Sequence, residues 1–178
     1  MHHTDSIEDT ADSYCYRASR LFYEDPPLAL SNLEAALSYE PHHLEALNMA
    51  GELHLFEYEK LSLTEEAANR IAGEFFDRAL VYGPQFAEAW SGKARMLFYR
   101  EEHDAAIEAA DRGLAVLHLR VGFGMQSKAV FTNVAESLYN VKVKSLMALG
   151  RREEARQELA AGLMECPGSE LLIRRVDA

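Results

Sequence analysis

One pattern of small and apolar residues recurs four times along this chain of 178 residues. Each copy starts at an alanine and continues with apolar or small residues 4, 7 and 8 places later. The leading alanines are Ala29, Ala72, Ala106 and Ala155, which lie 43, 34 and 49 residues apart. Those spacings are one period of 34 residues with insertions of 9 and 15. This period is typical of stacked helix–turn–helix repeats, so the pattern predicts an all-α solenoid.

The third copy is the most regular and shows how one repeat is built. Trp90 and Ala94 share one face of a helix that we expect over about residues 88–100, because they are four residues apart. A second helix is expected over about residues 104–117. Gly113 on that helix leaves room for a close crossing between the two.

This repeat resembles that of the tetratricopeptide repeat (TPR) family, which has an aromatic residue and several small residues at fixed places. The matching residues of the third copy are Trp90, Ala94, Leu97, Ala106, Ala110 and Gly113, although Lys93 and His118 depart from the family pattern. The resemblance implies a right-handed superhelix of antiparallel helix pairs, with about four repeats and a C-terminal capping helix. The implied parts are a flexible acidic N-terminus at 1–10, a TPR-like domain at 11–169 (repeats at about 11–43, 44–86, 87–120 and 136–169, insertion at 121–135) and a capping helix at 170–178.

The two insertions predict departures from the regular repeat. We expect the nine extra residues to lengthen both helices of the second repeat, to about residues 44–60 and 63–82. The tip of that hairpin would then expose Phe56 and Tyr58. After the second insertion, the apolar spacing predicts an unusually long helix over about residues 126–149.

Charge and hydropathy exclude several classes of partner. The formal net charge is −11, and residues 1–60 hold 12 acidic and 3 basic side chains. Nucleic acid is not an expected partner, because its binding depends on Lys and Arg that neutralise phosphates. The acidic half favours a basic partner, or it serves only to keep the protein soluble. The sequence has no apolar run of about 18 residues, so no membrane span is expected.

Cysteine and histidine usage argues against a redox or metal centre. Cys15 and Cys166 lie in the first and last repeats, so we expect no disulfide, and neither has a neighbouring basic or histidine cluster in the sequence that would activate a thiolate. His42 and His43 follow Pro41 in an expected turn, where they would be exposed. No cofactor, metal ion or catalytic motif is predicted. Without a secretory signal, a cytoplasmic location is expected.

The resemblance also implies where a partner would bind. In TPR proteins the first helix of each repeat lines a concave groove, and this chain carries Asn, Arg and Lys together with apolar residues at those positions. Arg95 and Lys144 would hold an acidic group, and Phe98 would anchor an apolar side chain. The peptide- or protein-binding residues implied in this way are Asn48, Glu52, Leu55, Ser91, Arg95, Phe98, Asn140, Lys144 and Met147.

Three functional hypotheses remain from the sequence. The first is a non-catalytic protein-interaction module (an adaptor, scaffold or chaperone-like protein) that binds a peptide or protein segment in the groove. The second is a structural module that self-associates through the Phe56 and Tyr58 hairpin tip or through the 126–149 helix. The third is an enzyme, which no motif supports. The Lys and Asn of the two-carboxylate clamp, with which some TPR proteins grip acidic C-termini, have no counterpart at the matching positions.

Overall fold

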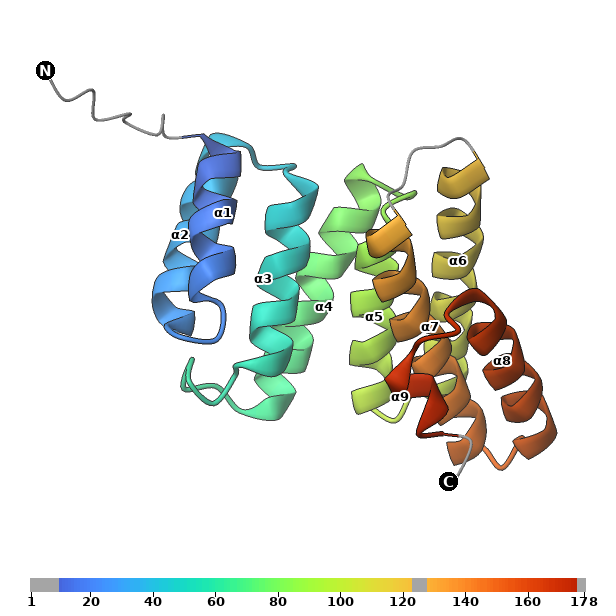
Figure 1. The fold of residues 1–178 in the computed structure, drawn as a ribbon. Helices are drawn as coiled ribbons and strands as arrows, with labels where there is room; N and C mark the ends of the chain where they lie inside the picture. The colour runs from blue at the N-terminus through green and yellow to red at the C-terminus, as the bar shows by residue number, and fades with distance from the viewer. Residues whose placement is uncertain (1–9, 123–127, 176–178) are drawn as a thin grey trace, which may run out of the picture. The chain divides into compact units, whose positions relative to one another are not determined.

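The computed structural model of the chain describes residues 10–122 and 128–175, and every regular element in these two ranges is a helix (Figure 1). The predicted all-α fold is therefore confirmed. The helices are α1 (Ala11–Leu21), α2 (Pro26–Tyr39), α3 (Leu44–Phe56), α4 (Glu65–Tyr82), α5 (Ala87–Tyr99), α6 (His103–Gly122), α7 (Lys128–Ala148), α8 (Arg152–Glu165) and α9 (Glu170–Ile173).

Consecutive helices pack as antiparallel pairs, α1 with α2, α3 with α4, α5 with α6, and α7 with α8 (Figure 1). The described residues form two compact units. The first contains α1 to α4 and ends at Tyr82, and the second begins at Gly83 and contains α5 to α9. Each helix pair corresponds to one copy of the sequence pattern, because the small residues of that pattern are the ones that let two helices approach closely.

The core of the first unit is made of the alanines and leucines that define the repeat. Ala29, Leu33 and Ala36 of α2 are completely buried, and they pack with Ala18 and Ala50 from the neighbouring helices. Burial of a leucine side chain contributes about 2 kcal/mol, so these positions supply much of the stability of the unit.

The start of α2 is fixed by residues that the sequence singles out. Asp25 is its N-cap, and the Asp25 side chain accepts a hydrogen bond of 3.1 Å from the Leu28 backbone N–H. Pro26 and Pro27 follow in the first turn. Backbone N–H groups in the first turn have no hydrogen-bond partner within the helix, so proline, which lacks this group, loses no hydrogen bond there.

Glycines mark the closest crossings in the second unit. A Cβ atom placed on Gly113 of α6 would lie 2.8 Å from Leu138 Cδ2 and 3.0 Å from Trp90 Cβ. A Cβ placed on Gly162 of α8 would lie 2.9 Å from Tyr139 Cγ. All of these distances are shorter than a van der Waals contact. A larger side chain does not fit at either position, which explains why the sequence has glycine there.

The expected lengthening of the second repeat is only half right. α4 occupies Glu65–Tyr82, as expected, but α3 ends at Phe56 and does not continue to residue 60. The connection contains Ser62 at φ 58°, a left-handed conformation that a continuing helix does not have. Phe56 and Tyr58 are half-buried, so the expected exposed apolar tip is not present.

The helices around the second insertion are longer than those of a regular repeat. α6 continues to Gly122, past the expected end near residue 117, and α7 spans 21 residues from Lys128 to Ala148, which confirms the expected long helix. The first two residues of that prediction, 126 and 127, lie outside the described residues, as does the rest of the 123–127 connection.

The C-terminal helix α9 is short. Ser169 caps it by accepting a hydrogen bond of 3.1 Å from the Leu172 backbone N–H. Leu172 is completely buried against the last repeat, whereas Leu171 is exposed. Residues 176–178, the remainder of the expected capping helix, lie outside the described residues. Across residues 10–122 and 128–175, no helix combines the length and the apolar character that a membrane crossing requires.

Candidate functional site

A cavity of about 830 Å³ opens in the second unit between α7, α8 and the end of α5. Three of the residues implied by the sequence, Phe98, Lys144 and Met147, line it. The Phe98 side chain comes from the last turn of α5, and the other two lie one helical turn apart on α7. The fold therefore brings an aromatic, a cationic and a flexible apolar side chain together in one hollow.

The ammonium group of Lys144 lies over an aromatic ring. Its Nζ atom is 4.2 Å from the centroid of the Phe98 ring, which is within cation–π range. Burial lowers the pKa of Lys144, and the nearby positive charge of Arg175 lowers it further. Within the described residues, no carboxylate forms an ion pair with Lys144. The cavity thus holds a desolvated positive charge that an anionic group would stabilise.

Three arginines that the sequence reasoning missed complete the positive side of the cavity. Arg152 and Arg156 lie on α8, and Arg175 follows α9. The Arg175 Nε donates a hydrogen bond of 3.3 Å to Asn140 Oδ1, so Arg175 is tied to the wall of the cavity. No periodic signal marks these three positions in the sequence, because they lie outside the first helices of the repeats. The spacing of four residues between the two arginines on α8 was the one available clue.

The other implied residues of the second unit are less accessible. Ser91 is only 4% exposed, and its hydroxyl group donates a hydrogen bond of 2.8 Å to Ser137 Oγ, which joins α5 to α7. Arg95 is half-buried on α5. Asn140 contacts the cavity indirectly, through the hydrogen bond that it accepts from Arg175. These residues support the wall of the site, whereas Phe98, Lys144 and Met147 form its surface.

The three implied residues of the first unit all lie on α3. Leu55 is buried, and Glu52 and Asn48 are half-buried. The Asn48 Oδ1 atom is enclosed and accepts no hydrogen bond from the described residues. The cavity of the second unit, by contrast, brings implied residues together with cationic side chains, so the second unit carries the stronger candidate site.

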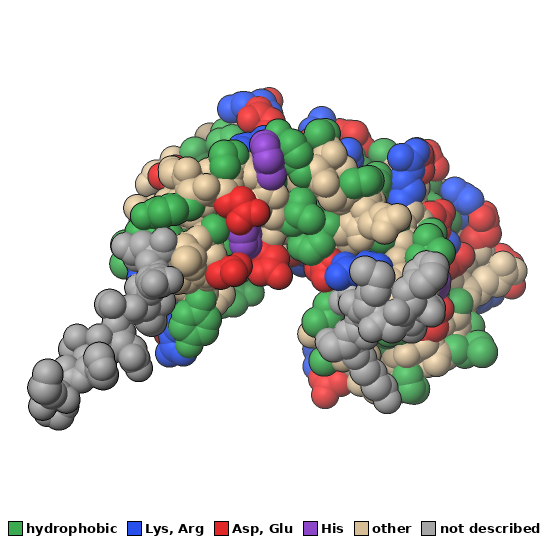
Figure 2. Space-filling view, turned by 90° about the horizontal axis from the view of Figure 1, so that it is seen from above, with side chains coloured by type: hydrophobic (Ala, Val, Ile, Leu, Met, Phe, Trp, Pro, Cys, Tyr) green, Lys and Arg blue, Asp and Glu red, His purple; other side chains and the backbone are tan. Residues whose placement is uncertain are grey.

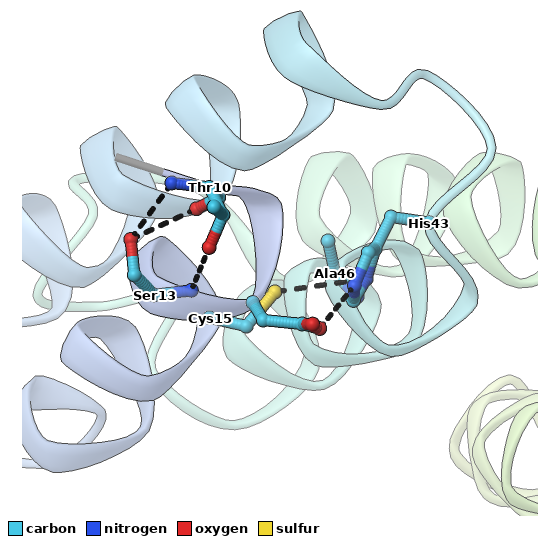
Figure 3. Close-up of polar contacts among 6 residues, drawn as sticks. Thr10, Ser13, Cys15, His43 and Ala46 are labelled. Carbon is cyan, nitrogen blue, oxygen red and sulfur yellow. Dashed lines mark hydrogen bonds and ion pairs between the residues drawn. The ribbon is translucent and has the colours of Figure 1, made fainter. Parts of the chain in front are cut away.

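A second cluster in the first unit resembles a catalytic triad and was not expected. Cys15 Sγ lies 3.7 Å from His43 Nδ1, and His43 Nε2 lies 2.9 Å from Asp12 Oδ1 (Figure 3). The expectations that Cys15 has no histidine neighbour and that His43 is exposed in a turn are therefore wrong. The turn after α2 folds the imidazole back onto α1, where its side chain is only 11% exposed.

The hydrogen bonds of His43 explain this cluster structurally. His43 is the N-cap of α3, and its Nδ1 atom accepts a hydrogen bond of 3.2 Å from the Ala46 backbone N–H. That lone pair cannot also take a proton from Cys15. Figure 3 shows the Cys15 sulfur pointing toward the His43 ring. In the tautomer that this cap requires, Nε2 carries the proton and donates a hydrogen bond to Asp12.

Electrostatics also disfavour a nucleophilic Cys15. Its side chain is 5% exposed, and burial together with the carboxylates of Glu45, Asp12 and Glu40 raises the pKa of the thiol to about 11. Acidic side chains surround a histidine on the face of the first unit that Figure 2 shows. Catalytic cysteines need positive surroundings that lower the pKa. The cluster of Cys15, His43 and Asp12 is therefore explained by the role of His43 as the N-cap of α3, and it does not activate the thiol.

Cys166 is similarly inert. It lies beside Pro167 but is only 1% exposed, and its Sγ atom lies 3.7 Å from the Thr132 carbonyl oxygen. Burial raises the pKa of its thiol, and the charges of Glu165 and Glu136 raise it further. Both cysteines are unpaired thiols. The part of the chain that the structure describes contains no group of three or more His, Cys, Asp or Glu side chains arranged to hold a metal ion.

Polar contacts join the helices around the cavity. The Lys142 ammonium on α7 lies 2.6 Å from Asp111 Oδ1 on α6 and 2.7 Å from Glu158 Oε1 on α8. Burial alone would lower the pKa of Lys142, but the hydrogen bonds to both carboxylates outweigh it and raise the pKa. Tyr139 donates a hydrogen bond of 2.9 Å to Glu165, which ties α7 to the end of α8. These contacts join α7 to both α6 and α8.

Comparisons with known proteins identify the fold. No protein-family model matches the sequence, and no curated protein sequence matches it either. Among solved structures, the chain is similar to TTC0263, a thermophilic TPR protein of Thermus thermophilus, with 15% identity, a TM-score of 0.73, and 93% of this chain and 78% of that chain covered. It is also similar to the MamA protein, with 17% identity, a TM-score of 0.63, and 87% and 72% of the two chains covered.

A third similar structure is YrrB, described as a TPR protein with an unusual peptide-binding site. The identity is 16%, the TM-score is 0.50, and the match covers 97% of this chain and 94% of that chain. At these identities the likeness concerns the fold alone. It agrees with the repeat pattern that the small residues of the sequence predict.

Proposed function

We propose that this chain, which has the fold of tetratricopeptide-repeat proteins, is a non-catalytic interaction module that binds a segment of another protein in the cavity of its second unit. The observation that carries the proposal is the meeting of Phe98, Lys144 and Met147 in one cavity, at positions that the resemblance to the TPR family implies for binding. Proteins of this fold act in general through protein partners, so the cavity has a natural use.

The composition of the cavity suits a protein segment. Apolar side chains from α7 and α8 line it together with cationic groups, as in many sites that bind peptides. Lys144 over Phe98 is already ordered, so a ligand that contacts it loses little additional side-chain entropy. The unusual peptide-binding site of YrrB is an instance of peptide binding by a protein of this fold, although that site belongs to YrrB.

An enzymatic role has no comparable support. The one constellation among the described residues that resembles catalytic machinery, Cys15 with His43 and Asp12, has a buried thiol of raised pKa and a histidine occupied as a helix cap. Self-association through Phe56 and Tyr58 has also lost its motivating feature, since both side chains are half-buried. The adaptor role therefore has the strongest physical basis.

The proposal is tested by selecting ligands from a random peptide library displayed on phage against the full chain. The affinities of the selected peptides are then measured by fluorescence anisotropy for the wild type and two variants. Met147→Glu places a charge on the cavity surface, whereas Leu119→Glu makes the same kind of change at an exposed apolar site on α6 outside the cavity.

We expect Met147→Glu to weaken binding about tenfold or more, because a carboxylate replaces an apolar contact, and Leu119→Glu to have no effect. Circular dichroism of both variants checks that the helices are retained. Selected peptides that bind both variants as tightly as the wild type would refute the assignment of the cavity.

A further inference from the structure

The cavity lies at the last helix pair that the structure describes, beside the short helix α9. α7 packs against both helices of the preceding pair, α5 and α6. Among the described residues, α8 packs against α7 and otherwise meets only α9, which has four residues. The short helix α9 contacts both α7 and α8, in the way that α7 contacts both α5 and α6, so it occupies part of the surface that α7 and α8 share. We call the cavity beside it, lined by α7, α8, Phe98 and Arg175, the end slot.

The α8 wall of the end slot has the spacing of a helix-packing surface. Its lining residues recur at intervals of three and one along nearly the whole helix, and they are Arg152, Ala155, Arg156, Leu159, Ala160 and Leu163. This stretch of α8 has a length of about 16 Å, or roughly three turns. Ala160 is small and exposed, which permits another helix axis to approach closely, whereas Ala155 is buried and packs with Val143 and Leu146 of α7.

The charges of the end slot point to an acidic occupant. Lys144 from α7, Arg152 and Arg156 from α8, and Arg175 after α9 all line it, and no acidic residue does. Within the described residues, Lys144, Arg152 and Arg175 form no ion pair, and Arg156 has a 3.4 Å contact with exposed Glu153. Such clustered cations in a half-enclosed apolar hollow repel one another until a negative group neutralises them.

We propose that the end slot binds an amphipathic α-helix of a partner protein, whose apolar face lies along α8 and whose acidic side chains flank that face and reach Lys144, Arg152 and Arg175. This inference rests on the proposed function and specifies the class of its ligand. The helical form follows from the three-turn stripe of α8. The acidic flanks follow from the cations, which come from both walls of the slot and would meet both edges of a bound helix.

The test uses defined peptides of about 18 residues, which is long enough to span three turns and leave flanks. The first peptide carries Leu and Ala on one helical face and Glu on both borders of that face. The second has the same composition in an order that has no amphipathic face. The third replaces every Glu of the first with Lys, and the fourth contains prolines that prevent a helix. Fluorescence anisotropy gives the affinity for the full chain, and circular dichroism gives the helicity gained on binding.

Two matched pairs of variants locate the binding. Arg175→Gln removes a cation that lines the slot, and Arg174→Gln removes its neighbour, which is exposed and lies outside it. Ala160→Glu puts an acidic group into the slot, and Gln157→Glu puts one on the exposed part of the same helix. All four positions are at least partly accessible, so none of the changes disrupts the core.

We expect the first peptide alone to bind and to gain helicity. Arg175→Gln should weaken this binding about tenfold, the usual effect of losing one charge-assisted contact, and Ala160→Glu should weaken it by at least as much. Arg174→Gln and Gln157→Glu should leave it unchanged. Raising the salt concentration should weaken binding of the first peptide, because the contacts are ionic.

Several outcomes would overturn the inference. Equal binding of the reordered or proline-containing peptide would show that the slot does not select an amphipathic helix. Tighter binding of the Lys peptide would show that it does not select acidic side chains. A dimer in sedimentation that Ala160→Glu abolishes would make a second copy the occupant. If phage-selected peptides remain sensitive to Met147→Glu while the acidic helix does not bind, this inference fails and the proposed function stands. If no peptide of any kind depends on Met147, the proposed function fails with it.

Discussion

Gly113 on α6 allows the packing that creates the second unit to be tested by adding a single methyl group. In the Gly113→Ala variant the new Cβ atom would lie 2.8 Å and 3.0 Å from the two methyl carbons of Leu138 and 3.0 Å from Trp90 Cβ. Leu138 is completely buried and cannot move aside freely. Trp90 Cβ is bonded directly to the backbone of α5. The added methyl therefore forces α6 away from both neighbouring helices.

Two opposing effects set the magnitude. In the interior of an exposed helix, replacing glycine with alanine stabilises a protein by about 1 kcal/mol. Overpacking of a core costs about 1–3 kcal/mol, and a methyl group in contact with two neighbouring helices belongs at the upper end of that range. The net expectation is a loss of about 1–2 kcal/mol in the free energy of unfolding, which reverses the sign given by helix propensity.

The assay is urea unfolding followed by the fluorescence of Trp90, the one tryptophan of the chain, which reports on the second unit directly. With a slope of about 1–3 kcal/mol per molar urea, the midpoint should fall by roughly 1 M or somewhat less. Gly168→Ala is the control, because no atom lies within 4 Å of its added Cβ, and it should leave the midpoint unchanged or slightly raised. A Gly113→Ala variant as stable as the wild type, or more stable, would refute the close crossing.

Three further predictions concern particular side chains. At pH 8 the Cys15 thiol should react with iodoacetamide about a hundredfold more slowly than an ordinary thiol, because its pKa is raised to about 11, and rapid labelling seen by mass spectrometry would contradict this. His43→Ala should lower the free energy of unfolding by about 1 kcal/mol in urea, whereas His43→Asn should retain the cap and the stability. Binding of an acidic helix should weaken as the pH rises toward the ordinary pKa of a lysine, since Lys144 has a lowered pKa and loses its charge early, and Lys144→Arg should remove this pH dependence.

The repeat pattern predicted the fold well because its small and apolar residues lie where helices pack against one another. Helices cross at the small or apolar residues of the pattern, and these crossings define the architecture. They include Ala29, Leu33, Ala106, Gly113 and Gly162. The same reasoning predicted the helix pairs and the long α7. These features depend on local spacing, which can be read directly from a sequence.

Element ends in the inserted segments were harder to predict. The apolar residues near Phe56 suggested a continuing helix, but the chain turns there, with Ser62 in a left-handed conformation. The leucines and aromatic residues that suggested an exposed tip pack partly against the first unit. Leu61, for example, contacts its core. Apolar spacing cannot distinguish a helix from a loop that is pressed onto a core.

The candidate site could be predicted only in part, since it combines two kinds of position. Phe98, Lys144 and Met147 follow from the resemblance to the TPR family, in which the first helices of the repeats line the groove. Arg152 lies on α8, the second helix of its pair, and Arg175 follows α9, so neither stands at a position that the TPR resemblance implies for binding. The cap formed by His43 was missed for a similar reason, because its contacts with α1 join residues 28 and 31 positions apart.

Methyl NMR of the chain labelled at its methionines measures the location of binding most directly. Met147 lines the end slot, Met96 is buried on α5 and does not line it, and Met49 packs in the first unit. On titration with the acidic amphipathic helix, the Met147 signal should shift progressively to saturation, while those of Met49 and Met96 stay in place. Saturable binding that shifts Met49 and leaves Met147 unmoved would contradict the assignment of the end slot as the binding site.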